Sequence, residues 1–376
     1  MSSKKGNILL YKGSNFLRQR LILSVLSGKP VYISEIRTLK DEPGLKEYEI
    51  SLIRLLDKIT NGTVVELNET GTTAYFQPGL LYGGAVEHDC SLQRGVGYYL
   101  EALVMLGLFC KQPLVATLRG ITSNNIDPSV DAIKSSMLNT VRKFILDDED
   151  LDLKINRRGL MPLGGGEVIF KCPIRKQTRP AQLLDCGMIK RIRGTSYALR
   201  VSPAISNRMV DKAKGVLLNF IPDVYINTDQ CRGKQSGKSP GFGIHLVAET
   251  TKGFTFSAEQ VSNVVSNGDD PSIPEDLGTA VAHRLLYEIY FGGVINSISQ
   301  SLAILFMALG DKDVSKIVTG PLTEYSIWFL RHLKDFFGVT LKIEPQEDEE
   351  NSGDGSAKVL LTCVGIGYTN LSKRTI

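Results

Sequence analysis

Hydrophobic and polar positions alternate along the chain with two different periods. Apolar residues three and four positions apart predict helices, and short runs of apolar and β-branched residues predict strands. Predicted helices cover residues 16–26, 48–59, 98–110 and 130–145, and predicted strands cover residues 30–36, 63–67, 73–77, 113–117, 152–157 and 167–173. These segments follow one another in the same order twice, which predicts two βαβαββ-like units.

A segment with a different pattern begins after residues 179–182. Its predicted strands are residues 187–201, 223–227 and 243–249, and its predicted helices are residues 204–219 and 258–267. The chain then continues with predicted helices at 277–290, 295–307 and 323–337 and predicted strands at 340–344 and 358–364. We therefore expect a large domain formed by residues 1–182 and 275–376, and an inserted α/β domain formed by residues 183–274.

Two polar segments interrupt these elements. Residues 229–242 (DQCRGKQSGKSPGF) are rich in glycine, lysine and serine, and residues 346–355 (QEDEENSGDG) are acidic. Both compositions are typical of solvated loops.

Composition restricts the class of protein. A chain with 42% hydrophobic and 22% charged residues is typical of a globular protein. The apolar stretches near residues 100–110 and 302–309 are shorter than the roughly 20 residues of a membrane helix, and the start MSSKK lacks the apolar core of a secretory signal. We expect a soluble intracellular protein without a membrane partner.

The six cysteines include no CxxC pair, and no HxH or HExxH spacing occurs, so the sequence predicts neither a disulfide framework nor a metal site.

Positive charge is concentrated in one part of the chain. The net charge is only +4, but residues 154–200 contain eleven lysines and arginines against two acidic residues. Such a stretch is able to follow a phosphate backbone, or it forms an ordinary solvated face, and both interpretations stay open.

Four segments resemble, in the right order, motifs of the RNA 3′-terminal phosphate cyclase family. They are IRTLKDEPGL at 36–45, FQPGLLYGG at 76–84, LRGITSNNIDPSVD at 118–131 and RGLMPLGGGEV at 158–168. The resemblance covers nearly the whole chain. It implies an α/β fold of α+β character, in which a large domain of repeated units resembles the C-terminal domain of translation initiation factor three and carries a smaller inserted α/β domain.

The resemblance also implies a reaction that this sequence is poorly equipped to perform. The family transfers adenylate from ATP to a histidine and then to an RNA 3′-phosphate, with help from metal-binding carboxylates. Here Tyr11, in YKGSNFLR, stands approximately where the acid is expected, and Tyr325 approximately where the histidine is expected. His332 follows about two helical turns later, roughly 10 Å away. A neutral phenol supplies no charge to a metal and is a poor nucleophile without a base. We expect no cyclase activity, no catalytic residue, no metal and no cofactor.

Basic residues in or near the matched motifs are candidates for binding an anion or RNA. The candidates are Arg18, Arg37, Lys40, Arg94, Arg119 and Arg158. For Lys40, pairing with Asp41, Glu42 or Glu49 is the competing interpretation.

Arg331 and Lys334 lie beside Trp328 on the helix predicted at 323–337. They are candidates for docking a protein partner, because arginine and aromatic residues concentrate binding energy at interfaces. Core packing accounts for most of the other apolar residues of this helix.

Within the family, the chain most resembles the eukaryotic cyclase-like branch. That resemblance implies a nuclear, nucleolar protein of the small-subunit processome. It also implies binding to pre-rRNA and to a GTPase ribosome-assembly factor, and a requirement in the early cleavages that yield 18S rRNA. Two enzymatic alternatives stay open, an endoribonuclease that acts directly on pre-rRNA and a residual RNA 3′-phosphate cyclase.

Overall fold

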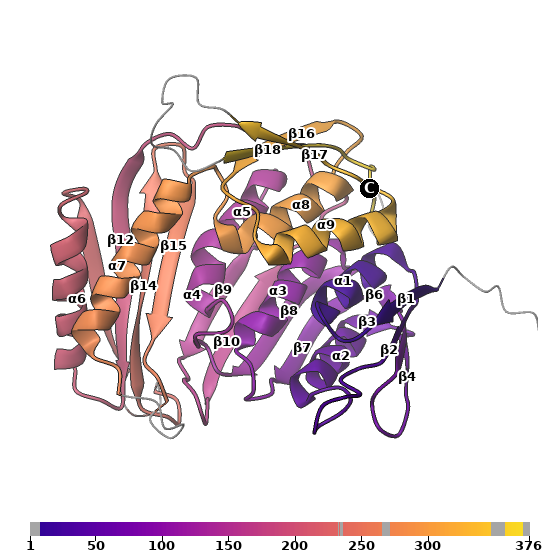
Figure 1. Ribbon diagram of the computed structural model, residues 1–376, viewed down its shortest axis with the longest axis horizontal. Coiled ribbons are helices and arrows are strands. Elements are labelled where there is room, and N and C mark those ends of the chain that lie inside the picture. Colours follow the sequence, from indigo (N-terminus) through magenta and orange to yellow (C-terminus); the bar gives the residue numbers. More distant parts are fainter. Residues whose placement is uncertain (1–7, 232, 234–235, 265–270, 347–357, 371–376) are drawn as a thin grey trace, which may run out of the picture.

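The computed structural model describes residues 8–231, 233, 236–264, 271–346 and 358–370, and it has the mixed α/β fold that the sequence predicts (Figure 1). Four four-stranded sheets carry the fold, and helices lie between and beside them. A small ribbon of β3 (Thr60–Asn61) and β6 (Leu80–Leu81) joins the first two of these sheets along the chain.

The first two units match the predicted order of helices and strands, except for the opening strand of each, which was not predicted. The first consists of β1 (Leu9–Lys12), α1 (Leu17–Ser27), β2 (Val31–Ser34), α2 (Glu47–Ile59), β4 (Val64–Leu67) and β5 (Ala74–Gln77). The second consists of β7 (Gly83–Asp89), α3 (Val96–Leu106), β8 (Gln112–Gly120), α4 (Val130–Ala132), α5 (Leu138–Phe144), β9 (Asp152–Arg157) and β10 (Gly166–Cys172). A π-helical turn, Ile133–Met137, joins α4 to α5. The two sheets share one strand order, β1-β2-β5-β4 and β7-β8-β10-β9.

A third unit of the same kind is completed by distant parts of the chain. It consists of β11 (Gln182–Leu183), α8 (Gln300–Leu309), β16 (Val314–Thr319), α9 (Glu324–Phe337), β17 (Lys342–Gln346) and β18 (Lys358–Val364). Its sheet order, β11-β16-β18-β17, repeats that of the other two, and β11 pairs parallel with β16. The sequence pattern did not predict this unit because more than a hundred residues separate its first strand from its first helix.

The helices of the three units share one hydrophobic core. Every residue of α3 and of α8 is buried, and the two helices are apolar on nearly all sides. Figure 1 shows them with α1, α5 and α9 in the middle of the large domain, and α1 contacts both α3 and α9. Because α3 and α8 have no solvent face, their apolar character holds the three units together.

The inserted segment forms its own sheet and core. Its elements are β12 (Ile189–Leu199), α6 (Ala204–Leu217), β13 (Val224–Cys231), β14 (Gly241–Thr250) and β15 (Thr255–Val261), with strand order β13-β12-β14-β15. The next helix, α7 (Pro274–Phe291), packs on α6, β14 and β15, and its Leu277, Val281 and Leu285 belong to this second core. The boundary predicted at 274 precedes this helix. We propose that the inserted domain extends through α7.

One predicted helix is wrong. Residues 255–261 form strand β15, which pairs with β14 from Thr255 to Val261. Ala258 and Val261 lie three positions apart, which suggested a helical face, but hydrogen bonding to β14 overrides this local pattern. The end of that predicted helix, residues 265–267, lies outside the described residues.

Other predicted elements differ from the observed ones in their bounds, and some observed strands were not predicted. Strands β1, β7 and β16 were not predicted. The polar loop predicted at 229–242 is shorter, because β13 continues to Cys231 and β14 begins at Gly241. The predicted acidic loop at 346–355 lies outside the described residues except for Gln346, the last residue of β17. Among the helices that the structure describes, none has both the length and the apolar character needed to cross a bilayer.

The contact between α6 and α7 depends on Gly278. A Cβ at this position would overlap the backbone carbonyl oxygen of Met209. We expect Gly278→Ala to force the helices apart and to lower the free energy of unfolding by about 1–3 kcal/mol, measured by urea denaturation. Gly215→Ala, on α6 with no atom within 4 Å of its Cβ, is the matched control. It should raise the stability by up to about 1 kcal/mol through helix propensity. Equal effects of the two substitutions would contradict this account.

Candidate functional site

Four helices begin around a cavity of about 490 Å³ in the large domain. The segments before α1, α2 and α3 and the first turns of all four helices form its wall. It brings together Tyr325 and four of the predicted anion ligands, Arg18, Arg37, Lys40 and Arg94. We call it the helix-end cavity. The N-terminal end of a helix carries partial positive charge, so this arrangement favours an anion.

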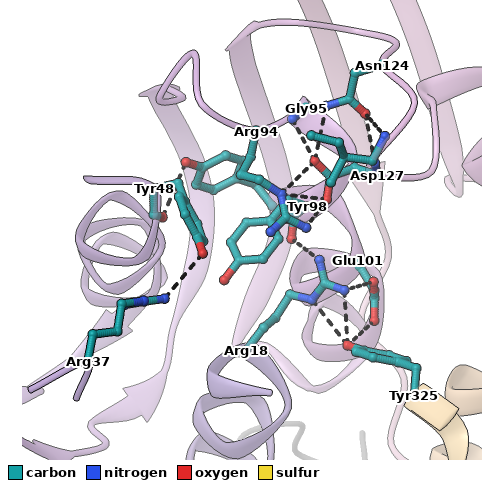
Figure 2. A network of polar contacts seen from close by, with 12 residues as sticks. Arg18, Arg37, Tyr48, Arg94, Gly95, Tyr98, Glu101, Asn124, Asp127 and Tyr325 are labelled. Carbon is teal, nitrogen blue, oxygen red and sulfur yellow. Dashed lines mark hydrogen bonds and ion pairs between the residues drawn. The ribbon is translucent and has the colours of Figure 1, made fainter. Parts of the chain in front are cut away.

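Arg18, in the first turn of α1, is held by three residues (Figure 2). Its Nε and Nη2 atoms donate to the Tyr325 hydroxyl at 3.2 and 3.1 Å, and it forms an ion pair with Glu101 on α3. Its Nη1 atom donates to the carbonyl oxygen of Tyr98 at 3.1 Å. Burial opposes the charge of Arg18, but the charge of Glu101 and the hydroxyl of Tyr325 raise its pKa above the ordinary value. Most donors of this guanidinium are therefore used within the protein.

The hydroxyl of Tyr325 donates to Glu101 Oε1 at 2.6 Å. Burial, together with the charge of Glu101, raises the pKa of Tyr325 well above its usual value of 10.0, although Arg18 acts in the opposite direction. The phenol consequently keeps its proton near neutral pH, and a protonated phenol is a weak nucleophile. The position at which the resemblance places the nucleophile thus carries a structural hydrogen bond.

Arg94, just before α3, is bound by Asp127 (Figure 2). Its Nε atom donates to Asp127 Oδ2 at 2.9 Å, and the same oxygen accepts from the N–H of Gly95 at 2.8 Å. The guanidinium carbon lies 4.6 Å from the ring centroid of Tyr98 and 5.1 Å from that of Tyr48. Asp127 therefore fixes both Arg94 and the backbone at the start of α3, and two aromatic faces complete the enclosure.

Arg37 and Lys40 lie on the loop before α2 and differ in their pairing. Two Arg37 nitrogens, Nη1 and Nη2, each donate to Glu49 at 2.7 Å, and these hydrogen bonds raise the pKa of Arg37. Lys40 is exposed. Two of the acids that were possible partners for it are used elsewhere, since Glu49 binds Arg37 and Glu42 lies 3.8 Å from Lys46. Lys40 thus adds positive charge to a cavity whose three arginines are each matched by a carboxylate.

Two predicted anion ligands lie away from the helix-end cavity. Arg119, on β8, is bound by Glu87 at 2.9 Å and Glu167 at 3.1 Å. Arg158 is buried behind the end of β9 and binds Asp131 at 2.5 Å and Asp229 at 3.0 Å. Asp229 belongs to β13, so Arg158 connects the second unit to the inserted sheet.

Tyr11, which stands approximately at the expected acid position, and His332, the histidine nearest to Tyr325 in the sequence, lie outside the cavity wall. The Tyr11 hydroxyl donates to Asp335 on α9 at 2.9 Å, and burial followed by this hydrogen bond raises its pKa. His332 is buried between α1 and α9. Its Nε2 atom accepts from Arg20 at 3.3 Å and its Nδ1–H donates to Gln19 at 2.9 Å. Burial and the charge of Arg20 lower the pKa of His332 to about 4, so the ring is neutral near pH 7.

The two predicted docking residues lie on the exposed side of α9. The guanidinium carbon of Arg331 is 4.5 Å from the ring centroid of Trp328, while Lys334 is in the last turn of the helix. They stay candidates for a partner surface.

Sequence analysis missed Glu101 and Asp127, the acids that bind Arg18 and Arg94. Glu101 is the one charged residue of α3, and a single charge within an otherwise apolar helix is a signal of a buried ion pair. Both carboxylates are occupied by arginine. Among the described residues, no group of three His, Cys, Asp or Glu side chains is placed to hold a metal ion. The residues around the cavity therefore do not fit the metal that the cyclase reaction requires.

The sequence matches the RNA 3′-terminal phosphate cyclase family over residues 9–343. The chain belongs to this family. A probable RNA 3′-terminal phosphate cyclase-like protein of Drosophila melanogaster is 59% identical over the whole chain and 99% of the relative. A human RNA 3′-terminal phosphate cyclase-like protein is 58% identical over 97% of both chains. The rRNA processing protein rcl1 of Schizosaccharomyces pombe is 41% identical over 98% of this chain and 99% of the relative. The predicted family resemblance is confirmed.

The Arg18–Glu101 pair provides the first test of the cavity. We expect Arg18→Met to lower the free energy of unfolding by about 3–5 kcal/mol, because Glu101 is left charged and buried without its partner. The double variant Arg18→Met/Glu101→Leu should recover part of this loss. Arg331→Met removes an exposed guanidinium and should cost at most about 1 kcal/mol. Urea denaturation measures all three. A double variant no more stable than Arg18→Met would contradict the pairing.

His332 predicts an acid sensitivity of the contact between α1 and α9. Its folded pKa of about 4 is below the value of 6.5 in the unfolded chain, so between these values the unfolded state binds more protons. Stability is therefore lost as the pH falls. Relative to His332→Gln, the wild type should lose about 2 kcal/mol between pH 7 and pH 5 in urea denaturation. The same pH dependence in both proteins would contradict a neutral buried His332.

Proposed function

We propose that this chain is a non-cyclising member of its family that binds RNA and acts in rRNA processing. The observation that carries the proposal is the state of Tyr325. Its proton is bound by Glu101, its oxygen also accepts from Arg18, and its pKa is raised. This arrangement supports a structural role for a residue that the resemblance places at the nucleophile position.

The rRNA-processing part of the proposal rests on the family relatives. One relative with 41% identity over nearly its full length carries the name rRNA processing protein rcl1. We propose that this chain acts in the nucleolus, within the small-subunit processome, in the cleavages that yield 18S rRNA. Pre-rRNA and a GTPase assembly factor are its proposed partners, and Arg331 and Lys334 are the proposed contacts for the GTPase.

The helix-end cavity supports retention of anion binding without catalysis. Helix N-termini surround it, and Lys40 lies beside Glu42 and Glu49, which pair with Lys46 and Arg37. Arg18, Arg37 and Arg94 are already neutralised, so we propose a single phosphate-sized ligand there and not a nucleoside triphosphate with its metal.

The test is rescue in cells depleted of this protein. Depletion should reduce 18S rRNA relative to the large-subunit rRNA and should leave the early precursor uncleaved, measured by RNA hybridisation. Tyr325→Phe, which removes the phenolic oxygen, should restore 18S rRNA to the wild-type level, because the proposed function needs no nucleophile there. Failure of Tyr325→Phe to rescue, at equal protein level, would contradict the proposal.

The purified chain distinguishes the enzymatic alternatives. Incubation with labelled ATP and an RNA ending in a 3′-phosphate should give neither covalent adenylate nor a cyclic terminus, while a family member that retains the histidine serves as positive control. Adenylate that disappears in Tyr325→Phe would establish a residual cyclase. Site-specific cleavage of precursor RNA by the purified chain would establish the endoribonuclease instead.

A further inference from the structure

A second cavity, of about 500 Å³, lies where the second unit meets the inserted domain. Arg157 at the end of β9, Arg200 just after β12, and Lys238 before β14 line it, together with Gly165, Gly237 and two further small residues. Among the described residues that line it, none has an acidic or an aromatic side chain. We call it the junction cavity.

Two glycine-containing segments build this cavity by contact between their backbones. The N–H of Lys238 donates to the carbonyl oxygen of Gly164 at 2.9 Å. Gly165 has φ +84°, and a Cβ on it would lie 2.9 Å from Lys238 Cγ, while a Cβ on Gly237 would lie 2.5 Å from the Gly164 oxygen. The triple glycine at 164–166 and the Gly/Lys/Ser-rich segment thus need glycine for the same reason, which is their mutual approach.

The three basic side chains of the junction cavity carry positive charge that few carboxylates lie close enough to neutralise. Within the described part of the chain, none of them lies within 4.0 Å of a carboxylate oxygen as an ion pair, although the charge of Arg157 helps to lower the pKa of Glu167. The Nε atom of Arg157 is buried and has no hydrogen-bond partner there. Arg200 donates from Nε to the carbonyl oxygen of Gly237 at 2.7 Å. Because a buried N–H without a partner is costly, the Nε donor of Arg157 favours an anionic ligand, and the exposed Arg200 and Lys238 add positive charge to the site.

Neighbouring carboxylates are already engaged. Glu167 faces Arg157 across the β9–β10 pair, but its oxygens accept from Arg119 and Asn156. The adjacent Arg158 is neutralised by Asp131 and Asp229 deeper in the protein. The contrast with the helix-end cavity is clear, because there each buried arginine has a carboxylate of its own.

The shape and composition of the site favour a strand over a small molecule. A smaller cavity of about 220 Å³ continues from it and shares Arg200, so the hollow is elongated. Besides Arg200 and Gln230, apolar and small residues line this continuation, and none of its described lining residues is aromatic or acidic. A site without stacking surfaces contacts the sugar–phosphate backbone and does not read bases.

We propose that the junction cavity binds a phosphate of an RNA backbone through Arg157, Arg200 and Lys238. The inference rests on the proposed function as an RNA-binding protein and adds a specific contact to it. It assigns a ligand to two of the basic residues of the stretch at 154–200. The contact contributes equally to RNAs of different sequence.

The test compares two double variants that remove the same charge. Arg157→Gln/Lys238→Gln alters the junction cavity, while Lys154→Gln/Lys190→Gln removes two exposed charges from the same basic stretch. Binding of a fluorescein-labelled, single-stranded RNA of mixed sequence is measured by anisotropy at several salt concentrations. The slope of log K against log salt should fall by about 0.7 in the cavity variant, the value for one lost phosphate contact on a single strand, and should change little in the control.

Further measurements keep the outcome unambiguous. Lys238→Glu changes an exposed side chain and should weaken RNA binding with an unchanged melting temperature. If the wild type bound RNA and the cavity variant behaved like the control, this inference alone would fail. If the wild type bound no RNA, the proposed RNA-binding function would fail with it. If inorganic phosphate raised the melting temperature of the wild type but not of the cavity variant, and RNA binding were equal in both, the site would bind a small anion and the assignment to RNA would be overturned.

Discussion

The shared burial of helices from three βαβαββ units is the constraint on which the rest of the structure depends. Helices α3 and α8 are apolar on nearly all sides and have no water-facing surface. They are stable only when the other units surround them, so the three sheets must close around one core. The helices then begin close to one another, and the helix-end cavity forms where α1, α2, α3 and α9 start. The site is therefore a consequence of how the units pack.

Burial in this core also decides the chemistry of the charged groups. A charge that lies inside must be paired, because removing it from water costs several kcal/mol. Arg18 is matched by Glu101, Arg37 by Glu49 and Arg94 by Asp127. Each pair secures the start of a helix and uses donors that would otherwise bind a ligand. Among the described residues, no carboxylate pairs in this way with the buried histidines His88 and His332. Burial lowers their pKa and keeps the rings neutral.

The proposed loss of catalysis and the proposed retention of binding have one physical basis. A phenol between a guanidinium and a carboxylate is a good structural link and a poor nucleophile. The rest of the fold is formed, and Arg158 joins the inserted domain to the second unit through its ion pairs with Asp131 and Asp229. Within the described part of the chain, Lys40 and the basic side chains of the junction cavity form no ion pair with a carboxylate. Those places are where we propose that anions bind.

The sequence by itself determined the α/β class, most elements of the first two units and the family, because each depends on local periodicity or on motifs in order. The division into a large domain and an inserted domain stays a prediction. The sequence also identified Arg18, Arg37, Lys40 and Arg94, which the fold brings to one cavity. Only the tertiary structure decided the third unit, since β11 and α8 are distant in the chain, and the strand β15, since pairing with β14 overrides its local pattern. The partners Glu101 and Asp127 depended on the fold as well. An ion pair joins residues that are far apart in sequence, and its strength is set by a burial that no single segment specifies.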